Sequence, residues 1–229
     1  MTPWEVIDHE RVPNGAGTIY LVNADDDWSI QLDGRELMGG GLHGSEEALA
    51  VKACARLEDT ENARVLVGGL GMGFTFSAAL RSVGKNGHVT VAELMPAVVR
   101  WNKQHVGMLA SHPLDDPRGT VHNGDVRELI KDVEPLWSAI LLDVDQGPGA
   151  LTRGTNSWLY DPPGLQALWD ALIPGGVLGI WSWCDDEELT ACLLEQGFEV
   201  DVVHYQEKDR VVANNAGTHI LWMAQRPSK

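Results

Sequence analysis

Apolar and polar residues alternate in several short stretches of the first 43 residues, a pattern typical of β-strands. Residues 4–7, 17–22 and 28–32 follow this pattern and are rich in β-branched and aromatic side chains. Asp33-Gly34 is a strong signal for a hairpin turn, and the glycine-rich stretch 38–41 predicts a bend. The N-terminal part is therefore predicted to form a small β-hairpin layer that packs against the rest of the chain.

The periodicity changes at Ser45. Glu46, Glu47 and an alanine-rich apolar stripe up to Leu57 follow it, which predicts a helix capped by Ser45. Strand-like and helical stretches then alternate. The predicted strands cover 64–69, 88–93, 119–122, 138–143, 177–181, 199–205 and 219–224, and the predicted helices cover 74–83, 96–107, 126–133, 162–172 and 187–195.

This alternation is typical of an α/β fold with a doubly wound, mostly parallel sheet, here of seven strands. The last two strands are joined without a helix, which predicts an antiparallel hairpin at one edge. We expect an N-terminal β-hairpin region over residues 1–43 and a second domain over residues 44–229. The loop over 144–160 is long enough to suggest a functional role.

Composition narrows the function. The 229 residues carry a formal net charge of −16, which argues against a nucleic-acid partner and is compatible with a small cationic or amine substrate. The simpler explanation of the charge is that acidity only keeps the protein in solution. The three cysteines predict no metal site and no disulfide framework. With no signal peptide and no membrane span in the sequence, we expect a cytoplasmic protein.

The stretch Val65-Leu-Val-Gly-Gly-Leu-Gly-Met-Gly73 carries the most information, because an apolar strand runs through glycines into a helix. Glycines here allow a tight turn and a close approach of a ligand to the backbone. A tight turn without a ligand remains an alternative. The spacing Gly69-x-Gly71-x-Gly73 lacks the third small residue of nicotinamide and flavin fingerprints, where this chain has Phe74.

Acidic residues follow three successive strands. Glu93 lies twenty residues beyond Gly73, where an acid typically accepts hydrogen bonds from ribose hydroxyls. Asp125 follows the third predicted strand, and Asp143 ends the fourth. Ligands of open α/β sheets bind at the carboxyl ends of the strands. The predicted cofactor site therefore combines the glycine turn with these acids and two of their neighbours: Gly69, Gly71, Gly73, Glu93, Leu94, Asp125, Val126 and Asp143. Each acid could instead cap a helix or lie in solvent, Asp125 in particular.

These motifs, in this order, resemble the polyamine aminopropyltransferase (spermidine synthase-like) family, which has the class I S-adenosylmethionine-dependent transferase fold. The resemblance rests on residues 28–38, 43–47, 66–73, 92–93, 124–125 and 140–148. It implies that Glu93 binds the ribose hydroxyls, that Asp125 binds the adenine amine, and that Asp143 accepts the proton of the attacking amine. It implies a Rossmann-like catalytic domain over 44–229 and a homodimer.

The resemblance also implies an acceptor site. Gly147-Pro148 matches a loop that covers the substrate, and Tyr160 lies near the position of that loop's conserved tyrosine, which makes it a second catalytic candidate beside Asp143. The predicted substrate-binding residues are Glu46, Asp145, Gln146, Trp158 and Tyr160. Aromatic faces attract cations, and Trp181 and Trp183 lie near the same edge, although core packing explains these two equally well.

Two departures leave the transferred group open. Gly71 stands where the family has an aspartate that contacts the aminopropyl amine. Gln146 stands where the family has a second aspartate in the loop after the catalytic one. Asp145 could replace this second aspartate only if the loop backbone differed from that of the family. The leading hypothesis is aminopropyl transfer from decarboxylated S-adenosylmethionine, releasing methylthioadenosine. The alternatives are a methyltransferase that releases S-adenosylhomocysteine, a non-catalytic family member, and, more distantly, a nicotinamide dehydrogenase. No metal is expected, and the acceptor is not identified by the sequence.

Overall fold

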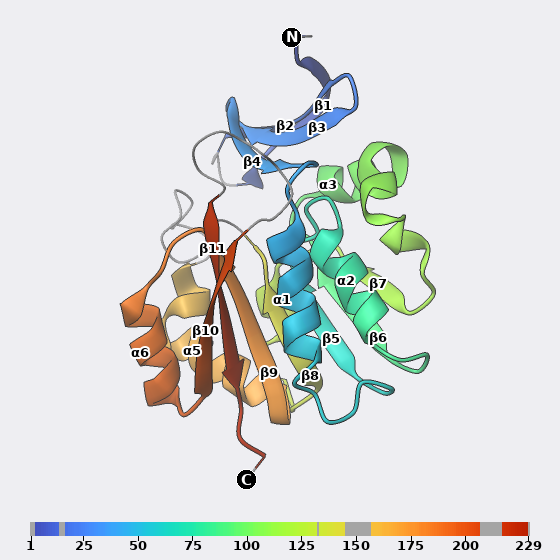
Figure 1. Cartoon of the computed structure of the whole chain (residues 1–229). Coiled ribbons are helices and arrows are strands. Elements are labelled where there is room, and N and C mark those ends of the chain that lie inside the picture. The colour runs from blue at the N-terminus through green and yellow to red at the C-terminus, as the bar shows by residue number, and fades with distance from the viewer. Residues whose placement is uncertain (1–2, 14–16, 132, 145–156, 207–216, 229) are drawn as a thin grey trace.

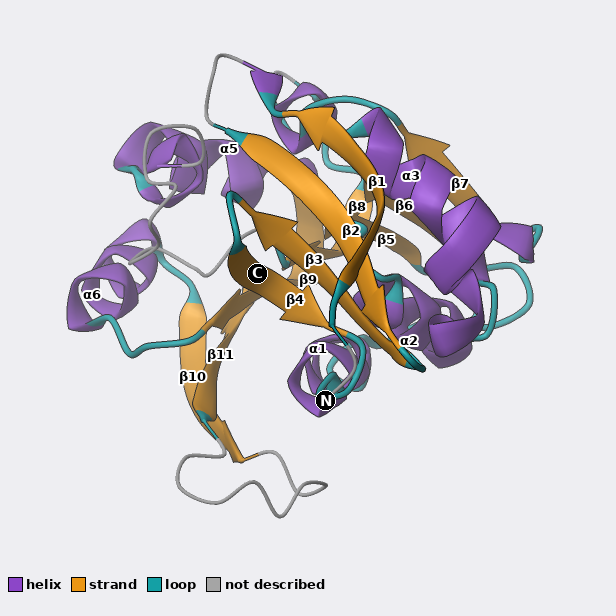
Figure 2. Cartoon of the chain, turned by 90° about the horizontal axis from the view of Figure 1, so that it is seen from above, coloured by secondary structure: helices purple, strands orange, loops and turns teal. Residues whose placement is uncertain are grey.

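The computed structural model describes residues 3–13, 17–131, 133–144, 157–206 and 217–228. They form two sheets (Figures 1 and 2). The strands of the N-terminal sheet are β1 (Glu5–Arg11), β2 (Thr18–Ala24), β3 (Asp27–Leu32) and β4 (Arg35–Gly39), each antiparallel to the next. Asp33 and Gly34 have positive φ angles of 46° and 81°, so the predicted hairpin turn is confirmed.

The main sheet has seven strands in the order β10-β11-β9-β8-β5-β6-β7. They are β5 (Arg64–Gly68), β6 (His88–Ala92), β7 (Gly119–His122), β8 (Trp137–Leu142), β9 (Leu172–Ser182), β10 (Glu199–Gln206) and β11 (Thr218–Gln225). All neighbours pair in parallel except β11, which is antiparallel to β9 and β10. The predicted fold class and the antiparallel hairpin are therefore confirmed, with β10 rather than the last strand at the edge.

Helices cover both faces of this sheet because successive strand residues point to opposite sides. In β8, Ala139 and Leu141 pack on one face, while Ile140 and Leu142 pack on the other. The first face holds α1 (Gly44–Cys54), α2 (Phe74–Ser82) and α3 (Pro96–Trp101), and the second holds α5 (Pro162–Ala171) and α6 (Glu187–Gln196). Figure 1 shows α1 and α2 side by side on their face of the sheet.

After β5, the chain adds β6 and β7 on one side of that strand and then adds β8 and β9 on its other side. The strand order therefore reverses between β5 and β8, which is the place where open α/β sheets bind ligands. The N-terminal sheet lies across the carboxyl end of the parallel strands (Figure 1). Its residues Ile19, Leu21 and Ile30 share a continuous core with the main sheet. The division of the chain at residue 43 stays a prediction.

Three local predictions differ from the structure. His43, not Ser45, is the residue before α1, because the Ser45 hydroxyl binds partners from other elements. The helix predicted over 126–133 is a single 3-10 turn, Val126–Leu129. The helix predicted over 96–107 is α-helical only to Trp101 and continues as a π-helix over Asn102–Val106. At that change, the Asn102 side chain donates to the carbonyl oxygens of Val98 and Gly71, so a tertiary contact sets the local geometry.

The region that the structure describes contains no helix with the length and apolar character needed to cross a membrane. Within the same residues, no group of three or more His, Cys, Asp or Glu side chains is placed to hold a metal ion. Cys54 is buried, and burial raises the pKa of its thiol to about 12, which leaves it protonated and unreactive.

Asp8 ties the N-terminal sheet to α3. Its carboxylate accepts hydrogen bonds from Arg100 Nη2 and Trp101 Nε1, both at 2.8 Å, and from Arg100 Nε at 3.2 Å. These side-chain hydrogen bonds, that from Arg100 first, lower the pKa of Asp8 to about 2. Since the folded pKa lies below the ordinary value of 3.8 for an aspartate, the stabilisation is complete above that value and is lost as the pH falls toward 2.

We expect Asp8→Asn to lower the free energy of unfolding by about 1–2 kcal/mol at neutral pH, a range limited by the partial exposure of this carboxylate. Urea unfolding followed by tryptophan fluorescence measures the change. The difference from wild type should shrink as the pH falls from about 5 to about 2. Asp26→Asn, at an exposed turn of the same sheet, is the matched control, and an equal loss in both variants would contradict the assignment.

Candidate functional site

The glycine turn follows β5 at the point where the strand order reverses. Gly69, Gly71 and Gly73 have φ angles of 87°, 51° and 91°, a region that other residues rarely adopt. A Cβ on Gly69 would lie 2.1 Å from the carbonyl oxygen of Asp143, at the end of β8. The ends of β5 and β8 therefore approach so closely that only glycine fits at position 69.

Glu93 follows β6 and is 8% exposed. Its carboxylate accepts hydrogen bonds from the backbone N–H groups of Leu70, at 2.9 Å, and Met95, at 2.8 Å. Burial raises the pKa of Glu93, and these N–H donors act in the opposite direction. Glu93 thus joins the glycine turn to the end of β6, which is where the sequence predicts a ribose-binding acid.

Asp125 follows β7 and caps the 3-10 turn, since Arg127 N–H donates to its Oδ1 at 2.9 Å. Its Oδ2 accepts hydrogen bonds from the Arg127 guanidinium. Partial burial is the largest single influence on the pKa of Asp125 and acts to raise it. The hydrogen bonds from the Arg127 side chain and backbone N–H, together with the charges of Arg127 and His122, outweigh it, so the net shift is downward. The capping alternative is therefore realised in the structure, and the adenine-binding role of Asp125 stays a prediction.

Asp143 directly follows β8, with its N–H bonded to the Gly68 carbonyl at 2.9 Å. Its Oδ2 accepts a hydrogen bond of 2.5 Å from Thr75 Oγ1, near the start of α2. Thr75 is buried and was not among the predicted site residues, because nothing in the sequence marks it. The hydroxyl fixes the orientation of the carboxylate that the sequence singles out as a proton acceptor.

The remaining predicted residues occupy different environments. Leu94 is exposed, Val126 is buried, and Glu46 is buried at the start of α1. Trp158 and Tyr160 lie in a 3-10 turn, Ser157–Tyr160, and pack against the core on the α5 side of the sheet. Asp145, Gln146 and the Gly147-Pro148 pair lie outside the described residues. Trp181 packs against the core, whereas Trp183 is 53% exposed, so core packing accounts only for Trp181.

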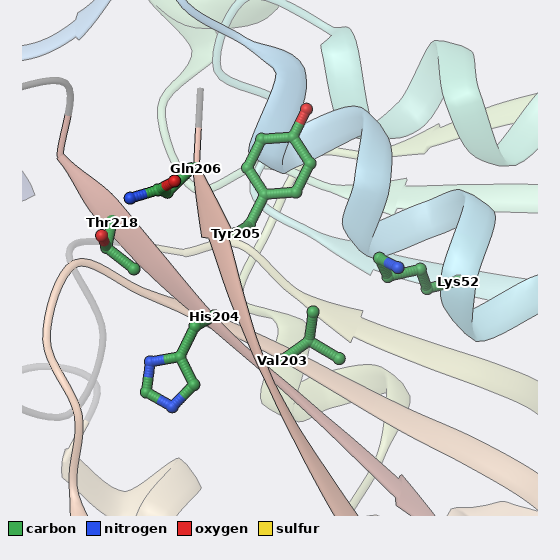
Figure 3. A pocket seen from close by; sticks show the side chains of 6 residues that line it. All are labelled: Lys52, Val203, His204, Tyr205, Gln206 and Thr218. Atoms are coloured by element: carbon green, nitrogen blue, oxygen red, sulfur yellow. The ribbon is translucent and has the colours of Figure 1, made fainter. Parts of the chain in front are cut away.

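A separate shallow hollow lies between α1 and the β10–β11 pair (Figure 3). Its lining residues are Lys52, Val203, His204, Tyr205, Gln206 and Thr218. Val203 and Tyr205 lie on the side of the pair that faces α1, while His204 points to the opposite side. None of the three strand-end acids contributes to this hollow, so it is not the predicted cofactor site.

The sequence is similar to curated proteins of one kind, the polyamine aminopropyltransferases. It is 30% identical over 184 residues to a polyamine aminopropyltransferase of Korarchaeum cryptofilum, an alignment that covers 80% of this chain and 50% of the relative. It is 31% identical over 132 residues to a polyamine aminopropyltransferase of Sulfolobus acidocaldarius, covering 58% and 42%. Over 80% of its length the chain is similar to the polyamine aminopropyltransferase (spermidine synthase-like) family. It spans about half the length of these curated relatives.

Solved structures of spermidine synthases have the same fold as this chain. A spermidine synthase in complex with the transition state analogue AdoDATO superimposes with a TM-score of 0.73 and 17% identity, covering 98% of this chain and 73% of that one. The spermidine synthase from Thermotoga maritima gives a TM-score of 0.75 and 17% identity, with 98% and 74% covered. No family model matches the sequence.

The departure from the family's pattern at Gly71 has a structural counterpart that the sequence did not indicate. Met38, on β4, packs over Gly71, and a Cβ at position 71 would lie 2.7 Å from the Met38 methyl carbon. The Met72 N–H points at the Met38 sulfur at 3.2 Å. A thioether therefore occupies the space beside the turn into which an aspartate side chain would extend. Asn102, which binds the Gly71 carbonyl at 2.7 Å, holds the turn from the other side.

Proposed function

We propose that this chain is a transferase that moves the aminopropyl group of decarboxylated S-adenosylmethionine to an amine acceptor, releasing methylthioadenosine. The observation that carries the proposal is the common edge formed by the glycine turn and three acids, Glu93, Asp125 and Asp143, at the point where the strand order reverses. The names of the curated relatives support the same reaction.

The chemistry of these acids fits an adenosyl group. Carboxylates accept hydrogen bonds and cannot donate them when ionised, and an adenosyl group offers two ribose hydroxyls and an exocyclic amine as donors. Glu93 would hold the ribose hydroxyls and Asp125 the amine, with Leu94 and Val126 beside them. The glycine turn adjoins these acids, with the Met38 thioether packed over Gly71.

In the proposed reaction, the donor supplies a sulfonium leaving group, which departs as a neutral thioether. The acceptor nitrogen forms a bond to the carbon attached to sulfur, and the electron pair of the broken C–S bond goes to sulfur. The nitrogen must give up one proton, and Asp143 would accept it. Thr75 fixes one oxygen of Asp143 at 2.5 Å, so the carboxylate needs little reorientation before the proton moves.

A methyltransferase that uses intact S-adenosylmethionine is the second candidate, and the Gly71–Met38 contact favours it. Without an acid at position 71, nothing in the glycine turn itself selects an ammonium-bearing tail over a tail that also carries a carboxylate. The two reactions leave different nucleosides behind, so the products distinguish them.

We expect purified protein, incubated with decarboxylated S-adenosylmethionine and a mixture of aliphatic diamines and polyamines, to release methylthioadenosine in mass spectrometry. A parallel incubation with S-adenosylmethionine should release no S-adenosylhomocysteine. The reverse result would replace aminopropyl transfer by methyl transfer. If neither donor bound in calorimetry, the chain would be a non-catalytic family member. The homodimer expected from the resemblance stays a prediction, and light scattering on the same protein tests it.

A further inference from the structure

One peptide group of the glycine turn, the one between Gly71 and Met72, is held by a side chain at each end. Its carbonyl oxygen, on Gly71, accepts a hydrogen bond of 2.7 Å from Asn102 Nδ2. Its N–H, on Met72, donates to Met38 Sδ at 3.2 Å. Met38 comes from the N-terminal sheet and Asn102 from the segment after α3, so two elements outside the turn set the plane of this peptide. We call Met38 and Asn102 the peptide clamp.

The amide of Asn102 can hold the turn in one orientation only. Asn102 is 3% exposed, and its Nδ2 also donates to the Val98 carbonyl oxygen at 3.0 Å. Because both neighbours are carbonyl oxygens, which only accept, the NH₂ group must face them. Within the part of the chain that the structure describes, Asn102 Oδ1 is buried without a hydrogen-bond partner. An unpaired buried acceptor lowers stability, so this side chain points to a role other than stability.

Both clamp residues lie at irregularities of the backbone. Asn102 begins the π-helix that follows α3. Leu37, directly before Met38, is an extra residue of β4, since β3 pairs with Met38 and then with Glu36. A bulge of this kind redirects the side chains beside it, and both π-helices and bulges are frequent next to functional sites. Two separate irregularities therefore direct side chains to the same peptide.

The turn that contains the clamped peptide touches two of the strand-end acids. The N–H groups of Leu70 and Gly71, which precede the clamped peptide, both bond the Glu93 carboxylate. Gly69, at the start of the turn, lies against the carbonyl oxygen of Asp143. Because the clamped peptide shares the α-carbon of Gly71 with the peptide that Glu93 holds, a change in its plane alters the backbone to which Glu93 is bonded.

We propose that Met38 and Asn102 are positioning residues for the sulfonium donor, because they fix the Gly71–Met72 peptide and with it the turn to which Glu93 is bonded. A turn that is already fixed loses less conformational freedom when the donor binds, which raises affinity. The clamp acts on the binding of the donor, while Asp143 takes the proton in the transfer step. The inference rests on the proposed transfer reaction and adds two residues to the donor side of that site.

Met38→Leu keeps an apolar side chain of similar volume but removes the sulfur, so the Met72 N–H loses its acceptor. We expect the dissociation constant of decarboxylated S-adenosylmethionine, measured by calorimetry, to rise about fivefold. The kcat at saturating donor and amine should not change, a split that a purely structural role of Met38 would not produce. Met108→Leu, at a methionine that is 52% exposed, is the matched control. Equal donor affinities in these two variants would overturn the proposal.

A double-mutant cycle tests whether the two side chains act on one peptide. Asn102→Ala leaves the Gly71 carbonyl oxygen without its donor, and we expect the same dissociation constant to rise about tenfold. Because both side chains hold the Gly71–Met72 peptide, the loss of affinity in the double variant should be smaller than the product of the two single losses. Losses that multiply would show that Met38 and Asn102 act independently, which would overturn the clamp.

Amide hydrogen exchange, followed by nuclear magnetic resonance, tests the clamp without turnover. The Met72 amide should exchange about tenfold faster in Met38→Leu than in the wild type or in Met108→Leu. An unchanged exchange rate would show that Met38 does not hold this N–H and would overturn the proposal. If the wild type binds a donor but transfers no aminopropyl group, only the transfer reaction is wrong, and the donor affinities still decide the role of the clamp. If the group is transferred and Met38→Leu binds the donor as tightly as Met108→Leu, only the clamp is wrong.

Discussion

Asp143→Asn is expected to lower kcat by about 10²- to 10⁴-fold, the usual contribution of a positioned proton acceptor. The amide keeps the shape of the side chain and can still face Thr75, but it cannot take up a proton near neutral pH. The dissociation constant of the sulfonium donor should change much less than kcat. Single-turnover kinetics with saturating donor and amine measure the chemical step, and calorimetry measures the binding of the donor.

The structure provides controls for this result. Asp185→Asn changes an exposed acid that follows β9 near the same edge, and its kcat should equal that of the wild type. Thr75→Val removes the 2.5 Å hydrogen bond while conserving volume, and a smaller loss of about tenfold is expected. If Asp143→Asn turned over at the wild-type rate, Asp143 would not be the proton acceptor.

The shared edge at which the candidate site residues lie was predictable, because each of them follows the end of a strand. Parallel strands align their carboxyl ends, so an acid after each apolar run must lie at a common edge, and the close approach of Gly69 to Asp143 follows from the order of β5 and β8. Glycines at positive φ and the Asp33-Gly34 turn were predictable for a similar reason, since local sequence sets local backbone geometry.

The contacts that refine the site were not predictable, because their partners lie far apart in the sequence. Ser45 looks like a helix cap, yet its hydroxyl binds Trp181 and His219, which lie 136 and 174 residues away. Met38 reaches the glycine turn from a different sheet. Each of these positions depends on tertiary packing, which overrides the local preference that a sequence pattern records.

Glu93→Gln is expected to weaken binding of the sulfonium donor by about tenfold to a hundredfold, the range for losing hydrogen bonds to a charged group. In the structure both carboxylate oxygens accept backbone N–H groups, one from the glycine turn and one from Met95. An amide has one oxygen, so its NH₂ group must face one of these donors, and the turn can no longer be held on both sides. Calorimetry with decarboxylated S-adenosylmethionine measures the loss.

The same substitution has a second consequence that separates binding from folding. Burial raises the pKa of Glu93, so ionising this side chain in the folded protein lowers the free energy of unfolding. This loss of stability is absent below the unfolded pKa and develops as the pH rises through the folded pKa. Glu93→Gln cannot ionise and should lose this part of the pH dependence of unfolding. Glu128→Gln, at a 63% exposed side chain near the same edge, is the matched control and should change neither quantity. Wild-type affinity for the donor in Glu93→Gln would show that the acid after β6 does not contact the ribose.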